Sequence, residues 1–303
     1  MKKRTSFFLL LAVFSIVACA SVTASAQHKV KIALWGDSWK NLDNATSEIA
    51  HVLLYNITDW DFQIHTGDFT HDGGEDSWQT TLHYPGIDSV FVKGRFYLCT
   101  SNHDAPVSRV KANWDVHTSG VLPINSTDST THFYAVHKGN VDIVFCDGYF
   151  TPPTVMQSWL HNYLSTSDRS DWLIGVWHNV SYGDLTYKTS YLSTCQPWID
   201  SLFHYGCRFI LNGHAHLYLR TKPLLPDGTI GNGDGIVTIV NGTGGATWEN
   251  PVKPNPKIVY SPSERSFPTV TFLTFEGRKV HVETVDCRPG KNLEVIDECD
   301  YEK

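Results

Sequence analysis

Apolar runs of strand length recur along the chain and alternate, through much of it, with segments of helical periodicity. The strand-like runs are Val30–Leu34, Asp61–His65, Arg95–Cys99, Val141–Cys146, Trp172–Val176, Arg208–Leu211, Ile236–Val240, Val270–Phe275 and Lys279–Val285. Helical spacing of apolar residues predicts helices over Thr46–Tyr55, Thr154–Leu164 and Gln196–His204, the last with Pro197 in its first turn. Because strand–loop–helix alternation builds a parallel sheet covered by helices, we expect an α/β fold with a largely parallel sheet. The last two strand-like runs, joined by Glu276-Gly277-Arg278, are typical of a hairpin.

The N-terminus has the pattern of an export signal. Three basic residues at positions 2–4 precede the apolar run Phe7–Ala18, which is too short to span a bilayer comfortably. Ala24-Ser25-Ala26 then fits a cleavage site. We therefore expect a signal peptide over residues 1–26 and a secreted or periplasmic protein without a stable membrane span. The alternative is lipoprotein processing at Cys19, because the preceding residues loosely resemble a lipobox.

Residues 27–303 read as a single domain, because no internal repeat, coiled coil or second hydrophobic helix interrupts the pattern. The net charge of −7 argues against binding nucleic acid, which needs a basic face. It leaves a small phosphate ester open as a partner, because bound metal ions can supply positive charge locally. Nothing in the sequence specifies an oligomeric state.

Export would place the six cysteines of the mature chain in an oxidising compartment, where an even number indicates disulfides. We expect Cys287 with Cys299 to close a C-terminal loop, and Cys195 with Cys207 to tie a helix start to the next strand. Cys99 and Cys146 either pair or are buried thiols. Glycosylation sequons, which would carry glycans in a eukaryotic secretory route, occur at Asn44, Asn56, Asn125, Asn179 and Asn241.

Five of the predicted strands are followed directly by residues with metal-binding side chains. In chain order these are Gly36-Asp37, Gly67-Asp68 with His71 and Asp72, Ser101-Asn102-His103-Asp104, His178-Asn179, and Gly213-His214-Ala215-His216. A single polar residue at a strand end is more often a cap than a ligand. Five in succession, at the sheet edge where α/β proteins build their sites, favour a shared site.

The residue types in these clusters suit divalent metals. Asp, Asn and His are ligands for borderline to hard ions, and His214 and His216, two residues apart, can serve neighbouring metals about 3.5–4 Å apart. A carboxylate such as Asp68 can bridge both ions. Such a pair activates a water and neutralises phosphate oxygens. His103 can then act as proton donor or charge stabiliser, with Asp104 orienting it.

This ordered set of motifs resembles the calcineurin-like metallophosphoesterases, and it is most similar to their small, tartrate-resistant purple-acid-phosphatase branch. The similarity covers nearly all of residues 27–303 and includes Asn241-Gly242-Thr243-Gly244-Gly245. It implies a four-layer αββα sandwich, in which two mixed sheets are flanked by helices. It also implies two metal ions (iron, zinc or manganese). Asp37, Asp68 and His216 would bind one ion, and Asp68, Asn102, His178 and His214 the other, with His103 as the outer catalytic histidine.

The chain departs from the family at the first metal site. Many members have Asp-x-His in the first motif, where this chain has Trp39, and the purple branch has a tyrosine where this chain has His71. We expect His71 to substitute as a ligand; the alternative is that Asp72 or water completes the shell. Without the phenolate we expect a colourless protein that prefers ferric iron less.

Two further departures concern the substrate side. Ser101 replaces the usual glycine before the Asn-His pair, which an ordinary φ would tolerate. No histidine follows His178 until His204, although Tyr182, Tyr187 and Tyr191 are available there.

The expected activity is that of a secreted acid-phosphatase-like phosphomonoesterase working by attack of a metal-bound hydroxide. The alternatives are a phosphodiesterase or nucleotide hydrolase on the same site, and a non-catalytic binding protein with this fold.

Overall fold

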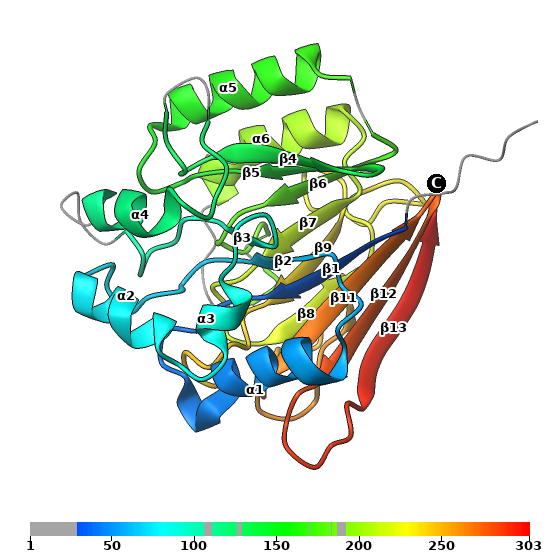
Figure 1. Cartoon of the computed structure of the whole chain (residues 1–303). Helices are drawn as coiled ribbons and strands as arrows, with labels where there is room; N and C mark the ends of the chain where they lie inside the picture. The colour runs from blue at the N-terminus through cyan, green and yellow to red at the C-terminus, as the bar shows by residue number, and fades with distance from the viewer. Residues whose placement is uncertain (1–28, 106–110, 126–128, 169, 183, 187–191) are drawn as a thin grey trace, which may run out of the picture.

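The computed structural model describes residues 29–105, 111–125, 129–168, 170–182, 184–186 and 192–303. The proposed signal peptide and the alternative lipidation site at Cys19 lie outside these residues. Within them, the chain forms two mixed β-sheets that pack against each other, with helices on their outer sides (Figure 1). This is the four-layer αββα sandwich that the family resemblance implied.

The first sheet has six strands and contains the N-terminal strand of the described chain. Its order is β13 (Val295–Glu302), β12 (Lys279–Asp286), β11 (Thr269–Glu276), β1 (Lys29–Trp35), β2 (Phe62–His65) and β3 (Phe96–Leu98). β1, β2 and β3 run parallel, whereas β11, β12 and β13 pair antiparallel. The predicted hairpin is confirmed: Glu276 pairs with Lys279 across a two-residue turn in which Gly277 has a φ of 55°.

The second sheet has seven strands. Its order is β10 (Ile258–Tyr260), β8 (Tyr218–Thr221), β9 (Val237–Asn241), β7 (Phe209–Asn212), β6 (Trp172–Val176), β5 (Val141–Phe145) and β4 (Tyr134–Lys138). The four central strands β5, β6, β7 and β9 are parallel, and antiparallel strands flank them on both sides. The expectation of one largely parallel sheet was therefore wrong, because antiparallel pairing extends both sheets.

The helices cover the outer faces of this sandwich. They are α1 (Ala45–His51) with the short flanking turns η1 (Leu42–Asn44) and η2 (Val52–Asn56), α2 (Glu75–Leu82), α3 (Ile87–Val90), α4 (Lys111–Thr118), α5 (Pro153–Thr166) and α6 (Leu192–His204). α5 and α6 lie over the seven-stranded sheet, and α1 and α3 lie on the side of the six-stranded sheet (Figure 1). α6 begins before the predicted Gln196, so Pro197 lies inside the helix and not in its first turn.

Two apolar clusters hold these layers together. The larger one lies between the sheets and combines residues of β1, β2, β11 and β12 with residues of β5, β6, β7 and β9. The smaller one lies between the seven-stranded sheet and the helices α5 and α6, where Trp177, Trp198 and Leu202 are almost fully buried. Burial of apolar surface on this scale is the main force that stabilises the sandwich.

The six cysteines of the described chain are free thiols, so neither expected disulfide is formed. In the β12–β13 ladder, Cys299 pairs with Val282, five residues along the strand direction from Cys287. At about 3.3 Å per residue this separates the two cysteines by roughly 16 Å, more than the ~7 Å that a disulfide can bridge. Burial raises the pKa of Cys195 and of Cys207 to about 12, so both remain protonated.

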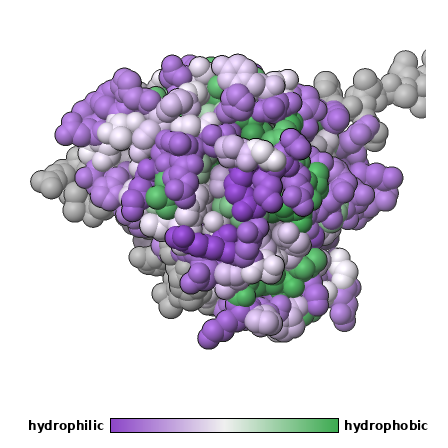
Figure 2. Space-filling model, turned by 90° about the horizontal axis from the view of Figure 1, so that it is seen from below, coloured by the Kyte–Doolittle hydropathy of each residue, from purple (hydrophilic) through white to green (hydrophobic). Residues whose placement is uncertain are grey.

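The five sequon asparagines differ in their exposure at the molecular surface. Asn44 and Asn56 are exposed, whereas Asn125, Asn179 and Asn241 are each at most 5% exposed. Seen from below, apolar residues lie in separate groups among hydrophilic ones (Figure 2). Among the described residues, no helix has the length and apolar character that crossing a membrane requires.

Candidate metal centre

The carboxyl ends of five parallel strands bring six of the proposed ligands together. Asp37 follows β1, Asp68 follows β2 and Asn102 follows β3, all in the six-stranded sheet. His178 follows β6, and His214 and His216 follow β7, in the seven-stranded sheet. The site therefore lies where the same edge of both sheets meets, and neither sheet alone supplies a complete set of ligands.

Three of these proposed ligands have backbone conformations that residues with side chains seldom adopt. The φ angle is 60° at Asp37, 53° at Asp68 and 67° at His214. Each such residue costs on the order of 1–3 kcal/mol, and backbone of this kind persists at functional sites because the surroundings enforce it. The neighbouring Gly67 has a φ of 91°, and a Cβ there would come within 2.7 Å of Ser101 and 2.9 Å of the His178 ring. Glycine is thus required for this approach.

Four proposed ligands converge on one point. The Nε2 atom of His178 lies 3.0 Å from Asn102 Oδ1 and 3.3 Å from Asp68 Oδ1. His214 Nδ1 lies 3.1 Å from the same Asn102 oxygen and 3.2 Å from His178 Nε2. These are the four residues that the family resemblance assigned to the second metal.

The orientation of His178 fits a cation at this point. Its Nδ1 lies 2.7 Å from the backbone carbonyl oxygen of Thr66, which can only accept a hydrogen bond. Nδ1 therefore carries a hydrogen, and Nε2 is the nitrogen left to offer a lone pair to a metal ion. That lone pair faces oxygens of Asp68 and Asn102, an arrangement that a positive ion between them stabilises. Histidine ligands of metals are commonly held in this way through their other ring nitrogen.

A second group of potential ligands lies alongside. Ligand atoms of Asp37, Asp68 and His216 all lie within 4.8 Å of one another, and all three residues are buried. His216 Nε2 is 3.4 Å from Asp37 Oδ1. The opposite ring nitrogen of His216 is 2.5 Å from the hydroxyl of Thr247 and 3.9 Å from a carboxylate oxygen of Glu249. Asp68 belongs to both groups, so its carboxylate is placed to bridge two ions.

The Asn241–Gly245 segment packs against the loop that carries Asp37. The Gly244 N–H donates to the Gly36 carbonyl at 2.7 Å, and the Ala246 N–H donates to the Asp37 carbonyl at 2.9 Å. A Cβ at Gly242 would lie 2.8 Å from the Asp37 carboxylate and 2.2 Å from a backbone oxygen. This glycine-rich segment is therefore part of the wall that holds the first ligand group.

His71 is not among the residues that gather at the first group. Its side chain is exposed, and its ring lies against Trp39 with 4.6 Å between the centroids. Its role as a ligand remains a prediction, as does completion of the shell by Asp72 or water. Ser101 keeps an ordinary φ, so its replacement of glycine creates no backbone strain.

His103 and Asp104 have different surroundings from those expected. His103 Nε2 lies 4.0 Å from Asp68 Oδ2, and its Nδ1 lies 2.5 Å from the backbone carbonyl of His71. Asp104 is fully buried and accepts hydrogen bonds from Ser101 and from Phe69 and Thr70, not from the His103 ring. Burial and the nearby Asp68 carboxylate raise the pKa of Asp104 to about 6. Asp104 thus joins the two ligand loops and does not orient His103.

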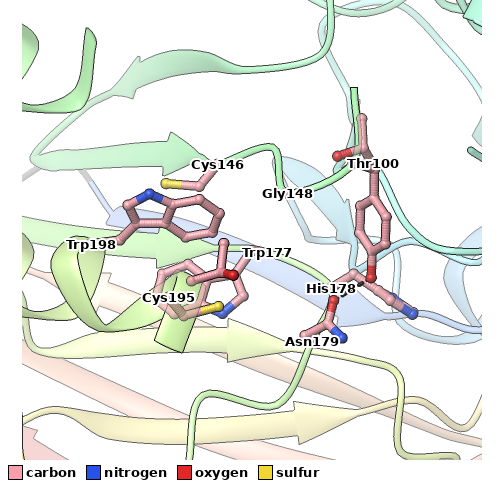
Figure 3. A pocket seen from close by; sticks show the side chains of 10 residues that line it. Thr100, Cys146, Gly148, Trp177, His178, Asn179, Cys195 and Trp198 are labelled. Carbon is pink, nitrogen blue, oxygen red and sulfur yellow. Dashed lines mark hydrogen bonds between the residues drawn. The ribbon is translucent and has the colours of Figure 1, made fainter. Parts of the chain in front are cut away.

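A small pocket opens beside His178. Figure 3 shows Trp177, Trp198, Cys146 and Cys195 along its inner wall, with His178 and Asn179 at its other side. The Tyr149 hydroxyl donates a hydrogen bond to the Asn179 side-chain oxygen. Tyr182, one of the tyrosines considered for substrate contact, is buried and directs its hydroxyl to the carbonyl of Leu225. Tyr187 and Tyr191 lie outside the described residues.

The sequence is similar to a known family of phosphoesterases and to a curated plant protein. Residues 30–218 match the family model of the calcineurin-like phosphoesterases. Over 184 residues the chain is 22% identical to Purple acid phosphatase 15 of Arabidopsis thaliana, which covers 58% of this chain and 35% of that protein. The chain therefore spans about a third of the length of this curated relative.

Solved structures share the fold at low sequence identity. The purple acid phosphatase PPD1 from yellow lupin (Lupinus luteus) seeds superposes with a TM-score of 0.72 at 16% identity, covering 91% of this chain and 54% of its own. GAP50, described as the anchor in the inner membrane complex of Plasmodium, has a TM-score of 0.65 at 12% identity, covering 90% and 89%. PhoD has a TM-score of 0.65 at 11% identity, covering 91% and 70%.

Proposed function

Since the chain belongs to the calcineurin-like phosphoesterase family, we propose that it hydrolyses phosphate monoesters with the help of two metal ions. The observation that supports this best is the pair of ligand groups that share the buried Asp68 carboxylate. A pair of metal ions about 3.5–4 Å apart is one arrangement that enzymes use for phosphate-ester hydrolysis, and these two groups would hold such a pair. Similarity to purple acid phosphatases supports the same reaction class.

Metal ions bound at these groups would lower the pKa of a water molecule and neutralise the charge on phosphate oxygens. The residues of the chain supply the remaining requirements. His103 is partly exposed beside Asp68, so it is placed to give a proton to the leaving oxygen of a bound ester. Asp104 fixes the loop that carries Asp68 against the loop that carries Asn102.

The identity of the metals is part of the proposal. Asp, Asn and His donors suit iron, zinc or manganese. No tyrosine stands at position 71, so a phenolate ligand there is absent and the purified protein should be colourless. A visible charge-transfer band would contradict this assignment.

We also propose export of the protein, with the mature chain beginning at Gln27. The proposal rests on the basic, apolar and small-residue pattern of residues 1–26. Sequencing the N-terminus of the protein after expression in a secreting host tests it. A mature chain that begins at Cys19 would support the lipoprotein alternative, and retention of Met1 would contradict both.

The activity is tested with p-nitrophenyl phosphate and with its bis ester. We expect faster hydrolysis of the monoester in the presence of iron, zinc or manganese. Faster hydrolysis of the bis ester would favour the phosphodiesterase alternative. Hydrolysis of neither would favour a non-catalytic role; GAP50 has this fold and is described as an anchor. Asn102→Ala and His214→Ala should remove activity while the protein remains folded, because both side chains converge on the second ligand group.

A further inference from the structure

Trp39, His71 and His103 form a cluster of three rings at the edge of the candidate metal centre, in which the His71 and His103 rings also lie 5.7 Å apart. The Trp39 ring stacks on His103 with 4.8 Å between centroids and 24° between planes, and it tilts against His71 at 4.6 Å and 42°. The Trp39 backbone carbonyl accepts a hydrogen bond from the Tyr84 hydroxyl at 3.1 Å. The indole N–H is buried without a hydrogen-bond partner in the described chain, so ring contacts hold this side chain.

The indole cannot replace a metal ligand. Trp39 stands two residues after Asp37, at the position where the Asp-x-His pattern has its histidine. An indole nitrogen carries a hydrogen and offers no lone pair to a metal, unlike an imidazole. The geometry instead directs the face of the ring toward His103.

One hydrogen bond fixes the protonation pattern of His103. The His71 carbonyl can only accept, so the Nδ1 atom of His103, 2.5 Å away, carries a hydrogen. Nε2 is the other ring nitrogen, and it faces Asp68 Oδ2 at 4.0 Å. The edge of the imidazole that carries Nε2 therefore lies on the side of the candidate metal centre.

That hydrogen bond does not by itself fix the plane of the ring. Asp104, the expected orienting residue, directs its carboxylate to Ser101 and Thr70. The Trp39 face stacks on the imidazole and opposes its rotation out of this plane, whereas the His71 ring lies farther away, at 5.7 Å and 32°. Stacked aromatic pairs favour one orientation by about twofold to tenfold, and an indole face also attracts a protonated imidazole.

We propose that Trp39 is a positioning residue for His103: its indole face and the His71 carbonyl hold the imidazole with Nε2 directed to the metal centre. The proposal rests on the proposed phosphoesterase activity for its kinetic consequence, but its geometric part does not. The position of Trp39 is therefore tested separately in the metal-free protein.

The geometric test uses histidine side-chain NMR signals of the metal-free protein. The indole ring current should shift the His103 ring protons upfield, and the His103→Gln variant identifies those signals by their loss. Trp39→Leu, which keeps apolar bulk without an aromatic face, should remove the upfield shift, whereas Trp39→Phe should keep part of it. An unchanged His103 shift in Trp39→Leu would overturn the proposal, whatever the activity.

The kinetic test compares aryl with alkyl phosphates. An alkyl leaving oxygen needs a proton more than p-nitrophenolate does, so loss of an aligned donor should affect alkyl esters most. We expect Trp39→Leu to lower kcat for an alkyl phosphate roughly twofold to tenfold, with smaller changes in KM and in aryl-ester kcat. Trp39→Phe should restore most of the loss, and metal content should stay the same.

The double variant separates positioning from a general loss of structure. If Trp39 acts through His103, adding Trp39→Leu to His103→Gln should lower kcat no further. Independent, multiplicative losses would overturn the proposal. Trp159→Ala is the matched control: this partly buried tryptophan in α5 contacts Phe133 and Tyr163, and its loss should leave the leaving-group dependence unchanged. If the wild-type protein hydrolyses no ester, the proposed function fails, and the NMR comparison alone decides the position of Trp39.

Discussion

A buried ion pair between Arg220 and Asp297 joins the two sheets, and its contribution to the free energy of unfolding can be measured. Arg220 on β8 of the seven-stranded sheet donates two hydrogen bonds of 2.7 Å to Asp297 on β13 of the six-stranded sheet. The Tyr218 hydroxyl donates a third to the same carboxylate at 2.7 Å, and Arg220 also donates to the Tyr301 hydroxyl at 2.9 Å. The side chains of Arg220 and Asp297 are only 6% and 5% exposed.

Asp297→Ala would leave the guanidinium buried without its counter-charge. Breaking a buried pair in this way costs about 3–5 kcal/mol, a large part of the roughly 5–15 kcal/mol that stabilises a typical domain. The double variant Arg220→Met/Asp297→Leu removes both charges and keeps apolar volume, so it should be far more stable than the sum of two single losses implies.

Urea unfolding followed by circular dichroism measures these changes. We expect Asp297→Ala to lower the unfolding midpoint by roughly 1 M or more. The control is Asp59→Ala, which removes a 2.6 Å pair with Lys31 whose carboxylate side is 63% exposed and should cost less than about 1 kcal/mol. Equal effects of Asp297→Ala and Asp59→Ala, or strict additivity in the double variant, would refute a buried contact between the sheets.

Three other outcomes follow from particular contacts. Thr247→Val removes the hydroxyl beside His216 Nδ1 and should weaken metal binding at the first group by about 10–100-fold, as measured by metal titration; unchanged affinity would show that the contact is unimportant. After expression in a glycosylating host, mass spectrometry should find glycans only at the exposed Asn44 and Asn56, and a glycan at buried Asn241 would contradict its position. The unfolded mature protein should react with a thiol reagent at six cysteines without prior reduction, and fewer would indicate disulfides.

The sequence predicted most of the buried strands because their apolar runs are short and uninterrupted; the exception is β8, whose four buried residues include Arg220 and Thr221. The strands that it missed lie at or near sheet edges. β13 has the sequence VIDECDYE, in which acidic residues interrupt the apolar ones and most side chains remain at least partly exposed. β10 has three residues, none of them fully buried. A half-solvated strand needs few apolar residues, so tertiary pairing and not composition determines where it forms.

The prediction of a Cys287–Cys299 disulfide failed for a related reason. Spacing along the chain places Cys287 and Cys299 in one loop, but the β12–β13 ladder holds them apart along the strand direction. The register of a hairpin depends on its turn and on which face is buried, and neither is visible in cysteine spacing.

The convergence of the six proposed ligands could be predicted because a parallel sheet carries the residues after its strands to one edge. The contacts around them could not be predicted in the same way. Thr66 holds His178 through a backbone oxygen that every residue possesses, so no side-chain pattern marks it. Thr247 contacts His216, and Trp39 contacts His103, only after loops from different strands have come together.

The two ligand groups that share Asp68 are expected to bind two metal ions. Elemental analysis of metal-loaded, desalted protein tests this expectation directly, with variants that remove one group at a time. We expect two ions per chain in the wild type, one in His178→Ala, one in His216→Ala and none retained tightly in Asp68→Ala. A single ion per chain in the wild type, or an unchanged content in Asp68→Ala, would contradict a shared two-metal centre.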